Sequence, residues 1–488
     1  MKNFLIPILT TVLLAGCSGV SDATKIAVLT DVHALSTQLV EANKGDSGAF
    51  AAYQAGNMRM VKESGEILRT TVARLVEEHP DVVLVTGDLT NNGERLSHEF
   101  VASQFCLLQE HGIKVLVVPG NHDTNNPYAK SWHGDETRQA ATITRQEFQE
   151  IYRTCGYGAE SELHDASLSY VAEPVEGLVV LGIDSNRDEE NRLKSRGDTV
   201  NTYHTAGRVK ASTLHWLTNK AREARKQGKR VVAMMHHHLI EHFDGESRLL
   251  RDYVVEDWET VRNALIDAGV HVIFTGHLHI TDIARSYHNG DSITDVATSS
   301  LSTYPFHYRI AELTNERMKV STRQVNNVPS NPRLLAEGKT HVEHAVGGLM
   351  AGMLNRGLRK MDGMVEKYAG VMGLSGAESD VLAHREEILA MCQRELLPAA
   401  QTAMVALYEG NEGANPQCRQ IISQAEQGVR QLVDTVFARN SNSFLHEFLS
   451  EELVPQVINV LRSMLEDRNH YHSPQEVVVD DHSAEFSY

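Results

Sequence analysis

Cysteine, positive charge and long apolar runs are all scarce in this chain, and each shortage excludes a class of protein. The 488 residues include only five Cys, none with metal-ligand spacing, which argues against a structural Cys-type zinc site. Lys and Arg number 46 against 64 Asp and Glu, so the formal net charge is -18 and nucleic-acid binding is not expected. Beyond the first residues, no stretch is long and apolar enough to predict a transmembrane helix.

The first residues are typical of an export signal. The apolar run from Phe4 to Leu14 is short for a membrane span and ends in Leu14-Ala15-Gly16-Cys17. This ending resembles the lipobox of bacterial lipoproteins, which implies cleavage before Cys17 and lipidation of its thiol. We therefore expect a signal peptide over residues 1–16, a tether over 17–23, and a protein exported to the cell envelope and lipid-anchored to a bacterial membrane. A plain secretory signal or a short N-terminal helix is the alternative.

Four further cysteines could oxidise in an exported protein: Cys106, Cys155, Cys392 and Cys418. Cys392 and Cys418 flank a loop in a helical region, so they form the favoured pair. Four buried free thiols are the alternative.

Residues 24–325 alternate short apolar runs with helical patterns, as a layered α/β domain does. Most runs are continuously apolar, which is typical of strands covered on both faces. The predicted strands are Ile26 to Leu29, Val82 to Val85, Val115 to Val118, Leu178 to Ile183, Val231 to Met234 and Val270 to Phe274. Apolar residues recur at helical spacing from Val61 to Val76 and from Phe100 to Leu108, which predicts a helix in each segment. From Ile293 to Val325 strand follows strand, which indicates an antiparallel portion at the end of the domain.

The remainder of the chain is predicted to be a separate helical unit. Residues 326–338 carry Pro329 and Pro332 among Asn and Ser, which is typical of a linker. Apolar residues then recur at helical spacing between three breaks, which predicts about four helices in an all-α bundle over 339–471. The acidic residues 472–488 are expected to form a flexible tail.

Five short motifs follow predicted strands directly. They are Asp31-Val32-His33, Gly87-Asp88-Leu89-Thr90, Gly120-Asn121-His122-Asp123, His236-His237-His238 and Gly276-His277-Leu278-His279. Because ligands bind at the carboxyl ends of strands in an α/β sheet, we expect the five loops to meet at one edge. Asp, Asn and His donors without sulfur suit divalent Mn, Fe or Zn. Each motif alone is weak, since Gly-Asp often forms a turn and a His run can lie on the surface; their order and strand contexts make the set specific.

In this order the motifs resemble the signature of the calcineurin-like metallophosphoesterase superfamily: Asp-x-His, Gly-Asp, Gly-Asn-His-Asp/Glu, His and Gly-His-x-His. The resemblance covers roughly residues 24–325. It implies a metallophosphoesterase-type four-layer αββα sandwich, followed here by the C-terminal all-α helical bundle. It also implies two divalent metal ions as cofactors and hydrolysis of a phosphate ester.

Carried over position by position, the resemblance implies a ligand set for each metal ion. One ion would be bound by Asp31, His33 and His279. The other would be bound by Asn121, His236 and His277. The carboxylate of Asp88 would bridge the two ions with its two oxygens. Two cations about 3.5–4 Å apart can clamp a phosphoryl group and lower the pKa of a bridging water, whose hydroxide would attack phosphorus.

Four neighbouring residues are candidates for other roles. His122 would protonate or stabilise the leaving alkoxide, and Asp123 would orient its imidazole, with a simple turn role for Asp123 as the alternative. His237 follows the ligand of the His run and is expected to contact phosphate or only to pack. Asn91 is a further possible substrate contact. The role of His238, which stands where related enzymes often carry Pro, is open.

Position 91 also narrows the subfamily. A purple acid phosphatase would need a Tyr three residues after Asp88 as an iron ligand, and this chain has Asn91. The stretch from Thr86 to Glu94 with Ser97-His98 looks more like the class III cyclic-nucleotide phosphodiesterases. The lipobox, core and helical region together resemble bacterial lipoproteins of that branch.

The sequence therefore predicts a phosphodiesterase acting on cyclic nucleotides or similar diesters, with a small phosphoester or nucleotide as its partner. A broad-specificity phosphomonoesterase or nucleotidase of the cell envelope is the alternative. A non-catalytic metal-binding surface lipoprotein is the third hypothesis. The sequence assigns no oligomeric state and no role to the helical bundle.

Overall fold

The computed structural model describes residues 23–42, 45–192, 201–348, 351–352, 386, 389–390, 393–394, 397–410, 416–437, 451, 454–466 and 481–487. The predicted signal peptide, Cys17 and Cys392 lie outside these residues, so lipidation and a bond from Cys392 to Cys418 stay predictions. Cys106 and Cys155 are free thiols. No helix in the described part of the chain combines the length and apolar character that a membrane span requires.

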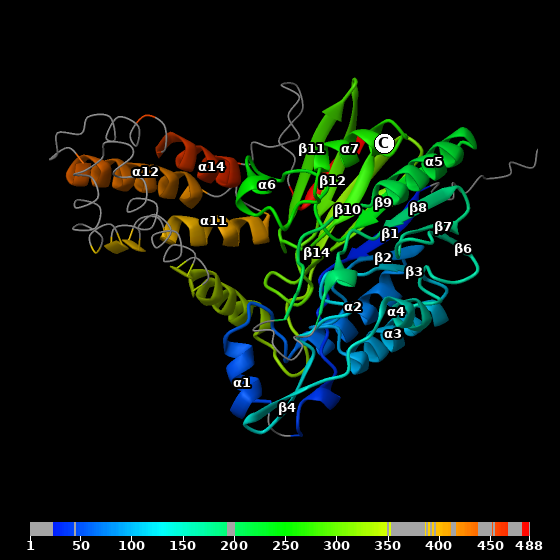
Figure 1. Cartoon of the computed structure of the whole chain (residues 1–488), viewed down its shortest axis with the longest axis horizontal. Helices are drawn as coiled ribbons and strands as arrows, with labels where there is room; N and C mark the ends of the chain where they lie inside the picture. The colour runs from blue at the N-terminus through cyan, green and yellow to red at the C-terminus, as the bar shows by residue number, and fades with distance from the viewer. Residues whose placement is uncertain are drawn as a thin grey trace, which may run out of the picture.

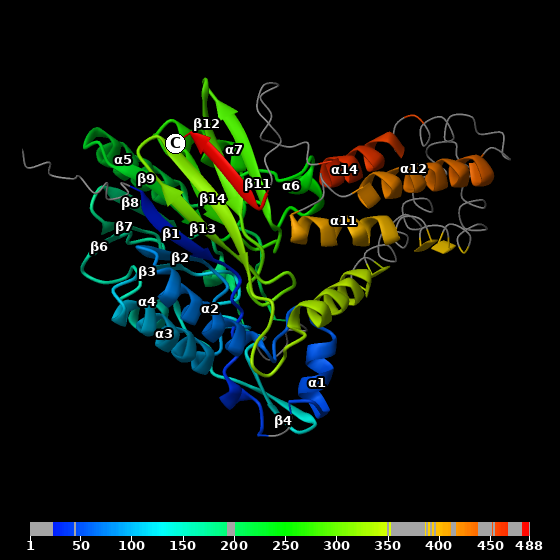
Figure 2. The same ribbon diagram turned by 180° about the vertical axis from the view of Figure 1, so that it is seen from behind.

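Two β-sheets lie at the centre of the molecule (Figures 1 and 2). The first has six strands in the order β15-β14-β13-β1-β2-β3. Their bounds are Thr24–Leu29 (β1), Val82–Thr86 (β2), Lys114–Val118 (β3), His307–Leu313 (β13), Arg317–Gln324 (β14) and Ser483–Ser487 (β15). The strands β1, β2 and β3 are parallel, and β13 and β14 pair antiparallel, as predicted for the end of this domain.

The second sheet has seven strands in the order β11-β12-β10-β9-β8-β7-β6. Their bounds are Ser161–Leu163 (β6), Tyr170–Val175 (β7), Leu178–Ile183 (β8), Arg230–Met235 (β9), Val272–Thr275 (β10), Asp282–His288 (β11) and Asp291–Ala297 (β12). The strands β8, β9 and β10 are parallel. A separate hairpin joins Lys130–His133 (β4) to Glu136–Gln139 (β5).

Helices cover the outer faces of both sheets. Ser64–Glu78 (α2) and Arg95–Glu110 (α3) pack on the first sheet, and Ala211–Lys226 (α5) and Trp258–Ile266 (α7) pack on the second. Arg145–Ile151 (α4) contacts α3, Gly48–Ala55 (α1) contacts the β4–β5 hairpin, and Glu246–Leu249 (α6) is a further short helix. Figure 1 shows α2 and α3 on one side of the sheets and α5 and α7 on the other. These layers give the predicted αββα sandwich.

Alternation of side chains along the strands explains the sandwich. In β9, Val232 and Met234 belong to the core shared with the first sheet, whereas Val231, Ala233 and Met235 pack with α5 and α7. Both faces are therefore buried, which is why the sequence of this strand is continuously apolar rather than alternating.

The C-terminal part is helical where the structure describes it. A helix over 334–348 is followed by Leu397–Glu409 (α11), Pro416–Phe437 (α12) and Val454–Glu466 (α14), and the last three contact one another beside the sandwich (Figure 2). The first helix begins at 334, inside the predicted linker 326–338.

The predicted flexible tail over 472–488 is wrong for residues 483–487. These residues form β15, which pairs antiparallel with β14 at the edge of the first sheet. Ala484 and Phe486 are buried there, while Glu485 is exposed. The strand is short and lies among acidic residues, so its own sequence does not predict a strand. It forms because the edge of β14 offers unpaired backbone groups.

Candidate metal centre

The seven predicted metal ligands converge at the carboxyl ends of parallel strands. Asp31 and His33 follow β1, Asp88 follows β2 and Asn121 follows β3, all in the first sheet. From the second sheet, β9 is followed by His236, and β10 by His277 and His279. The sequence led us to expect that the ligands meet at one edge of a single sheet. This expectation is incomplete, because the site is assembled from loops of both sheets of the sandwich.

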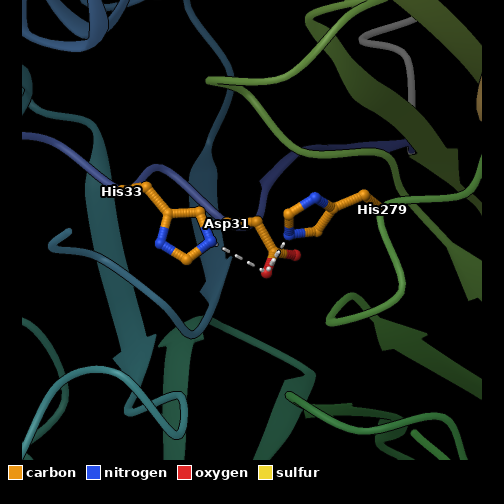
Figure 3. Close-up of side chains that lie close together, drawn as sticks. All are labelled: Asp31, His33 and His279. Atoms are coloured by element: carbon orange, nitrogen blue, oxygen red, sulfur yellow. Dashed lines mark ion pairs between the residues drawn. The ribbon is translucent and has the colours of Figure 1, made fainter. Parts of the chain in front are cut away.

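The first group of ligands surrounds one carboxylate oxygen (Figure 3). His279 Nε2 lies 3.2 Å and His33 Nε2 lies 3.7 Å from Asp31 Oδ1. The other oxygen, Asp31 Oδ2, accepts hydrogen bonds from Thr30 Oγ1 and from the amide of His277. Asp31 Oδ1 is buried without a hydrogen-bond partner, as expected of an atom whose partner is a cation.

The second group consists of Asp88, His236 and His277, whose ligand atoms lie within 4.8 Å of one another. Asn121 Oδ1 completes it at 3.0 Å from His236 Nε2. His236 Nδ1 donates to the carbonyl of Thr86 (2.9 Å), which turns Nε2 toward the group. His277 Nε2 donates to the carbonyl of Asp252 (3.2 Å), which leaves Nδ1 as its unprotonated nitrogen.

Asp88 connects the two groups through a single oxygen. Its Oδ2 lies 3.5 Å from His33 Nε2 and 3.4 Å from His236 Nε2. Its Oδ1 accepts instead from the backbone amide of His122 (2.8 Å). The expectation that both oxygens bridge the metal ions stays a prediction; in this structure Oδ2 faces both groups and Oδ1 holds the loop of His122.

The ligand loops are built from an unusual backbone. Asp31, His33, Asp88, His277 and His279 all have positive φ, between 43° and 70°. Left-handed backbone in non-glycine residues is uncommon and concentrates at functional sites.

Two glycines allow the loops to approach one another closely. A Cβ at Gly120 would lie 2.1 Å from Asp88 Oδ1, and one at Gly276 would lie 1.9 Å from Thr30 Oγ1. The glycines of the motifs are therefore required by steric contact with the ligand residues.

The electrostatics of the site favour cations. Burial alone would raise the pKa of Asp88, but His236, His122 and His33 hold it well below its usual value. The pKa of Asp31 is also lowered, against burial, by His279 and His236. Burial acts to lower the pKa of His236, yet Asp88 and Asp31 raise it to about 9. Two buried anions surrounded by nitrogen donors are suited to divalent metal ions.

His122 lies beside the centre without belonging to either group. Its Nε2 is 4.0 Å from Asp88 Oδ2, and its side chain is 23% exposed. Nδ1 donates to the carbonyl of Asn91 (2.9 Å), because a carbonyl oxygen can only accept. Burial lowers the pKa of His122 to about 4, with Asp88 opposing the shift, so the ring is neutral and Nε2 carries the free lone pair.

The prediction that Asp123 orients His122 is wrong. The Asp123 carboxylate accepts hydrogen bonds from the amides of Gly120, Leu89 and Thr90, at 2.8–3.1 Å. It ties the loop after β3 to the loop after β2, which is the turn role held as the alternative. Asn91 and Asn92 hold the imidazole of His122 in its place.

The side chains of His237 and Asn91 are buried among other residues, which for His237 is the packing role held as the alternative. His237 is fully buried; its Nε2 donates to the carbonyl of Thr205 and its Nδ1 accepts from Ser185 Oγ, both at 2.8 Å. The side chain of Asn91 is also buried and bonds to Tyr53 and Glu94. In both residues the polar atoms are already satisfied inside the protein.

Arg59 is a residue of the site that the motifs did not predict. Its Nη1 donates to the carbonyl of Asn91 (3.2 Å) and lies 2.7 Å from His33 Nδ1. Arg59 lines a cavity of about 680 Å³ together with His33, Asp88 and His122. No motif marks this Arg in the sequence, because it comes from a loop that follows no predicted strand.

Comparison with known proteins gives the class of this one. The sequence model of the family described as calcineurin-like phosphoesterase matches residues 24–281, which is more than half of the chain. The chain belongs to this family. It is a hydrolase of phosphate esters that uses two divalent metal ions, and the two groups of ligands fit that requirement.

Individual relatives are distant. A probable cyclic nucleotide phosphodiesterase from Vesicomyosocius okutanii subsp. Calyptogena okutanii is 22% identical over 176 residues, covering 34% of this chain and 74% of the relative. A solved dimetal phosphatase from Danio rerio aligns with a TM-score of 0.41 at 16% identity, over 62% of this chain and 96% of its own. A purple acid phosphatase from yellow lupin aligns with a TM-score of 0.37 at 13% identity, over 62% and 51%.

Removing the shared carboxylate tests the centre. We expect Asp88→Ala to lose both metal ions and to lower kcat by about 10³-fold or more, since a metal-stabilised transition state is worth several kcal/mol. Metal content of the dialysed protein, measured by mass spectrometry, checks this. Asp252→Asn is the control: this carboxylate is 47% exposed and lies in the same cavity, so both ions should stay bound. Full metal content in Asp88→Ala would contradict the assignment.

Proposed function

We propose that this phosphoesterase is a phosphodiesterase acting on cyclic nucleotides or similar diesters. The observation that carries the proposal is the cavity above the metal centre. Its volume of about 680 Å³ falls within the range of about 300–1,000 Å³ for small-molecule sites. Besides the ligands, the cavity is lined by the apolar and aromatic residues Met58, Leu250, Tyr253, Leu278, Met404 and Tyr408. Such a space suits an ester with a large organic group.

The charges in the cavity also favour a diester. Among the described residues that line it, Arg59 is the only Lys or Arg, and Asp252 lines the same cavity. A phosphodiester carries one negative charge, whereas a monoester carries up to two near neutral pH. Apart from the metal ligands, the cavity is therefore lined by one fixed cation and one carboxylate, which matches the smaller charge more closely.

Metal ions and residues of the chain would have different roles in the reaction. Bound metal ions would polarise the phosphoryl oxygens and lower the pKa of a water molecule. Arg59 can donate to a phosphoryl oxygen from the side of His33. His122 presents Nε2 to the same space. Because this nitrogen is unprotonated, it would first take up the proton that the attacking water releases and then pass it to the leaving ester oxygen. The name of the distant relative, a probable cyclic nucleotide phosphodiesterase, supports this substrate class.

A substrate panel tests the proposal. We expect the purified, metal-analysed protein to hydrolyse bis-p-nitrophenyl phosphate and 3',5'-cyclic nucleotides with higher kcat/KM than p-nitrophenyl phosphate. Exclusive turnover of the monoester would replace the phosphodiesterase by a phosphomonoesterase or nucleotidase. Absence of any turnover with Mn, Fe or Zn would favour a non-catalytic metal-binding protein.

Truncation of His122 separates proton transfer from metal binding. We expect His122→Ala to retain both ions, because His122 lies in neither ligand group, and to lower kcat by roughly 10²–10⁴-fold. Steady-state kinetics together with metal analysis measure both effects. Loss of metal with unchanged turnover per metal bound would show that His122 is a ligand instead.

We propose further that the chain is exported and anchored in the cell envelope through Cys17, on the lipobox-like sequence before it. Cys17→Ala should then move the protein from the membrane fraction to the soluble fraction, while leaving the activity of the purified protein unchanged. Fractionation followed by immunoblotting provides the measurement. A variant that stays with the membrane would exclude this anchor.

A further inference from the structure

The C-terminal helix α11 is attached directly to the loop that carries two metal ligands. Thr281 lies two residues after His279. Its amide donates to the carbonyl of Leu407 and its hydroxyl donates to the carbonyl of Tyr408, both at 2.8 Å. Gly410 has φ +68°, and a Cβ there would lie 2.6 Å from the carbonyl oxygen of Thr281. The carboxyl end of α11 is therefore held in a fixed position relative to the metal centre.

Two further contacts hold α11 in place. Glu409 accepts a hydrogen bond from Tyr304 Oη (2.5 Å), which belongs to the loop between β12 and β13, and it pairs with Lys339 Nζ at 2.7 Å. Lys339 lies in the helix over 334–348, from which the carbonyl of Glu343 also accepts from Gln401 of α11. These bonds tie α11 to both the sandwich and the preceding helix. They therefore fix the orientation of its inner face, the side of α11 that carries Met404 and Tyr408.

That inner face lines the cavity above the metals. Met404 and Tyr408 are four residues apart, so they lie on the same side of α11. Both line the cavity that His277 and His279 also line. Tyr408 Oη donates to Met58 Sδ at 4.0 Å, and the ring of Tyr253 lies 4.6 Å from that of His277, at an interplanar angle of 35°. This part of the lining thus contains aromatic rings and thioethers.

We propose that Met404 and Tyr408 of α11, with Tyr253, form the subsite that binds the nucleobase of the substrate. The subsite deepens the proposed function, because it supplies the contact for the organic half of a nucleotide ester. Aromatic faces stack on any base, and a thioether packs against flat rings, so this wall recognises a nucleobase by its surface. The C-terminal helical region then belongs to the active site.

Inhibition by adenosine, which has the base but no phosphate, tests the subsite. We expect adenosine to compete with bis-p-nitrophenyl phosphate in the unaltered protein. Tyr408→Ala should raise its inhibition constant about tenfold or more, the size of one lost base-stacking contact. Tyr408→Phe keeps the ring and should stay within about twofold of the unaltered protein. Val405→Ala is the matched control, since Val405 is buried in the same helix but does not line the cavity.

Three results would overturn the subsite. The first is that adenosine does not inhibit the unaltered protein. The second is that Tyr408→Ala and Val405→Ala lose inhibition equally. The third is that the inhibition constant of Tyr408→Ala is unchanged. Should Tyr408→Ala not fold, Met404→Ala makes the same comparison with Val405→Ala. If the protein cleaves only p-nitrophenyl phosphate, the phosphodiesterase proposal fails, and adenosine inhibition of that monoester reaction still decides the subsite.

Discussion

A single carboxylate oxygen, Asp88 Oδ2, is the point around which the centre is organised. It faces His33 from the first sheet and His236 from the second at almost equal distances, 3.5 and 3.4 Å. Both imidazoles reach this atom because β1 pairs with β2 within the first sheet and β2 contacts β9 across the sandwich. A slip of one residue along any of these strands would turn its side chains to the opposite face and separate the ligands. The packing of the sandwich therefore determines the geometry of the metal site.

Burying two carboxylates away from water is unfavourable unless each is hydrogen-bonded and compensated by positive charge. The loops meet the first need with backbone amides: His277 donates to Asp31, and His122 donates to Asp88. Left-handed backbone at the ligand residues accompanies this arrangement. The second need is met by imidazoles and by the two metal ions of the family. The left-handed conformations of the ligand residues lie in loops, while the strands beneath them keep regular pairing and bury their apolar side chains in the core.

The motifs predicted residue positions better than residue roles. They correctly predicted strands before each ligand, but Asp123 proved to tie two loops together, and His237 and Asn91 proved to be buried. Adjacent residues in a loop point in different directions, so a neighbour of a ligand need not face the substrate. The strand β15 was missed for a related reason, since its pairing depends on the open edge of β14, a partner more than 150 residues earlier in the chain.

The sequence by itself determined the class of chemistry, the strands that precede the motifs and the donor types, because these depend on local apolar patterning and on short motifs after each strand. Only the tertiary structure decided that one oxygen of Asp88 serves both groups and that Arg59 stands beside His33. It alone brought α11 against the loop of His279 to close the cavity. These features depend on distances between segments far apart in the chain, and no pattern of neighbouring residues encodes such distances.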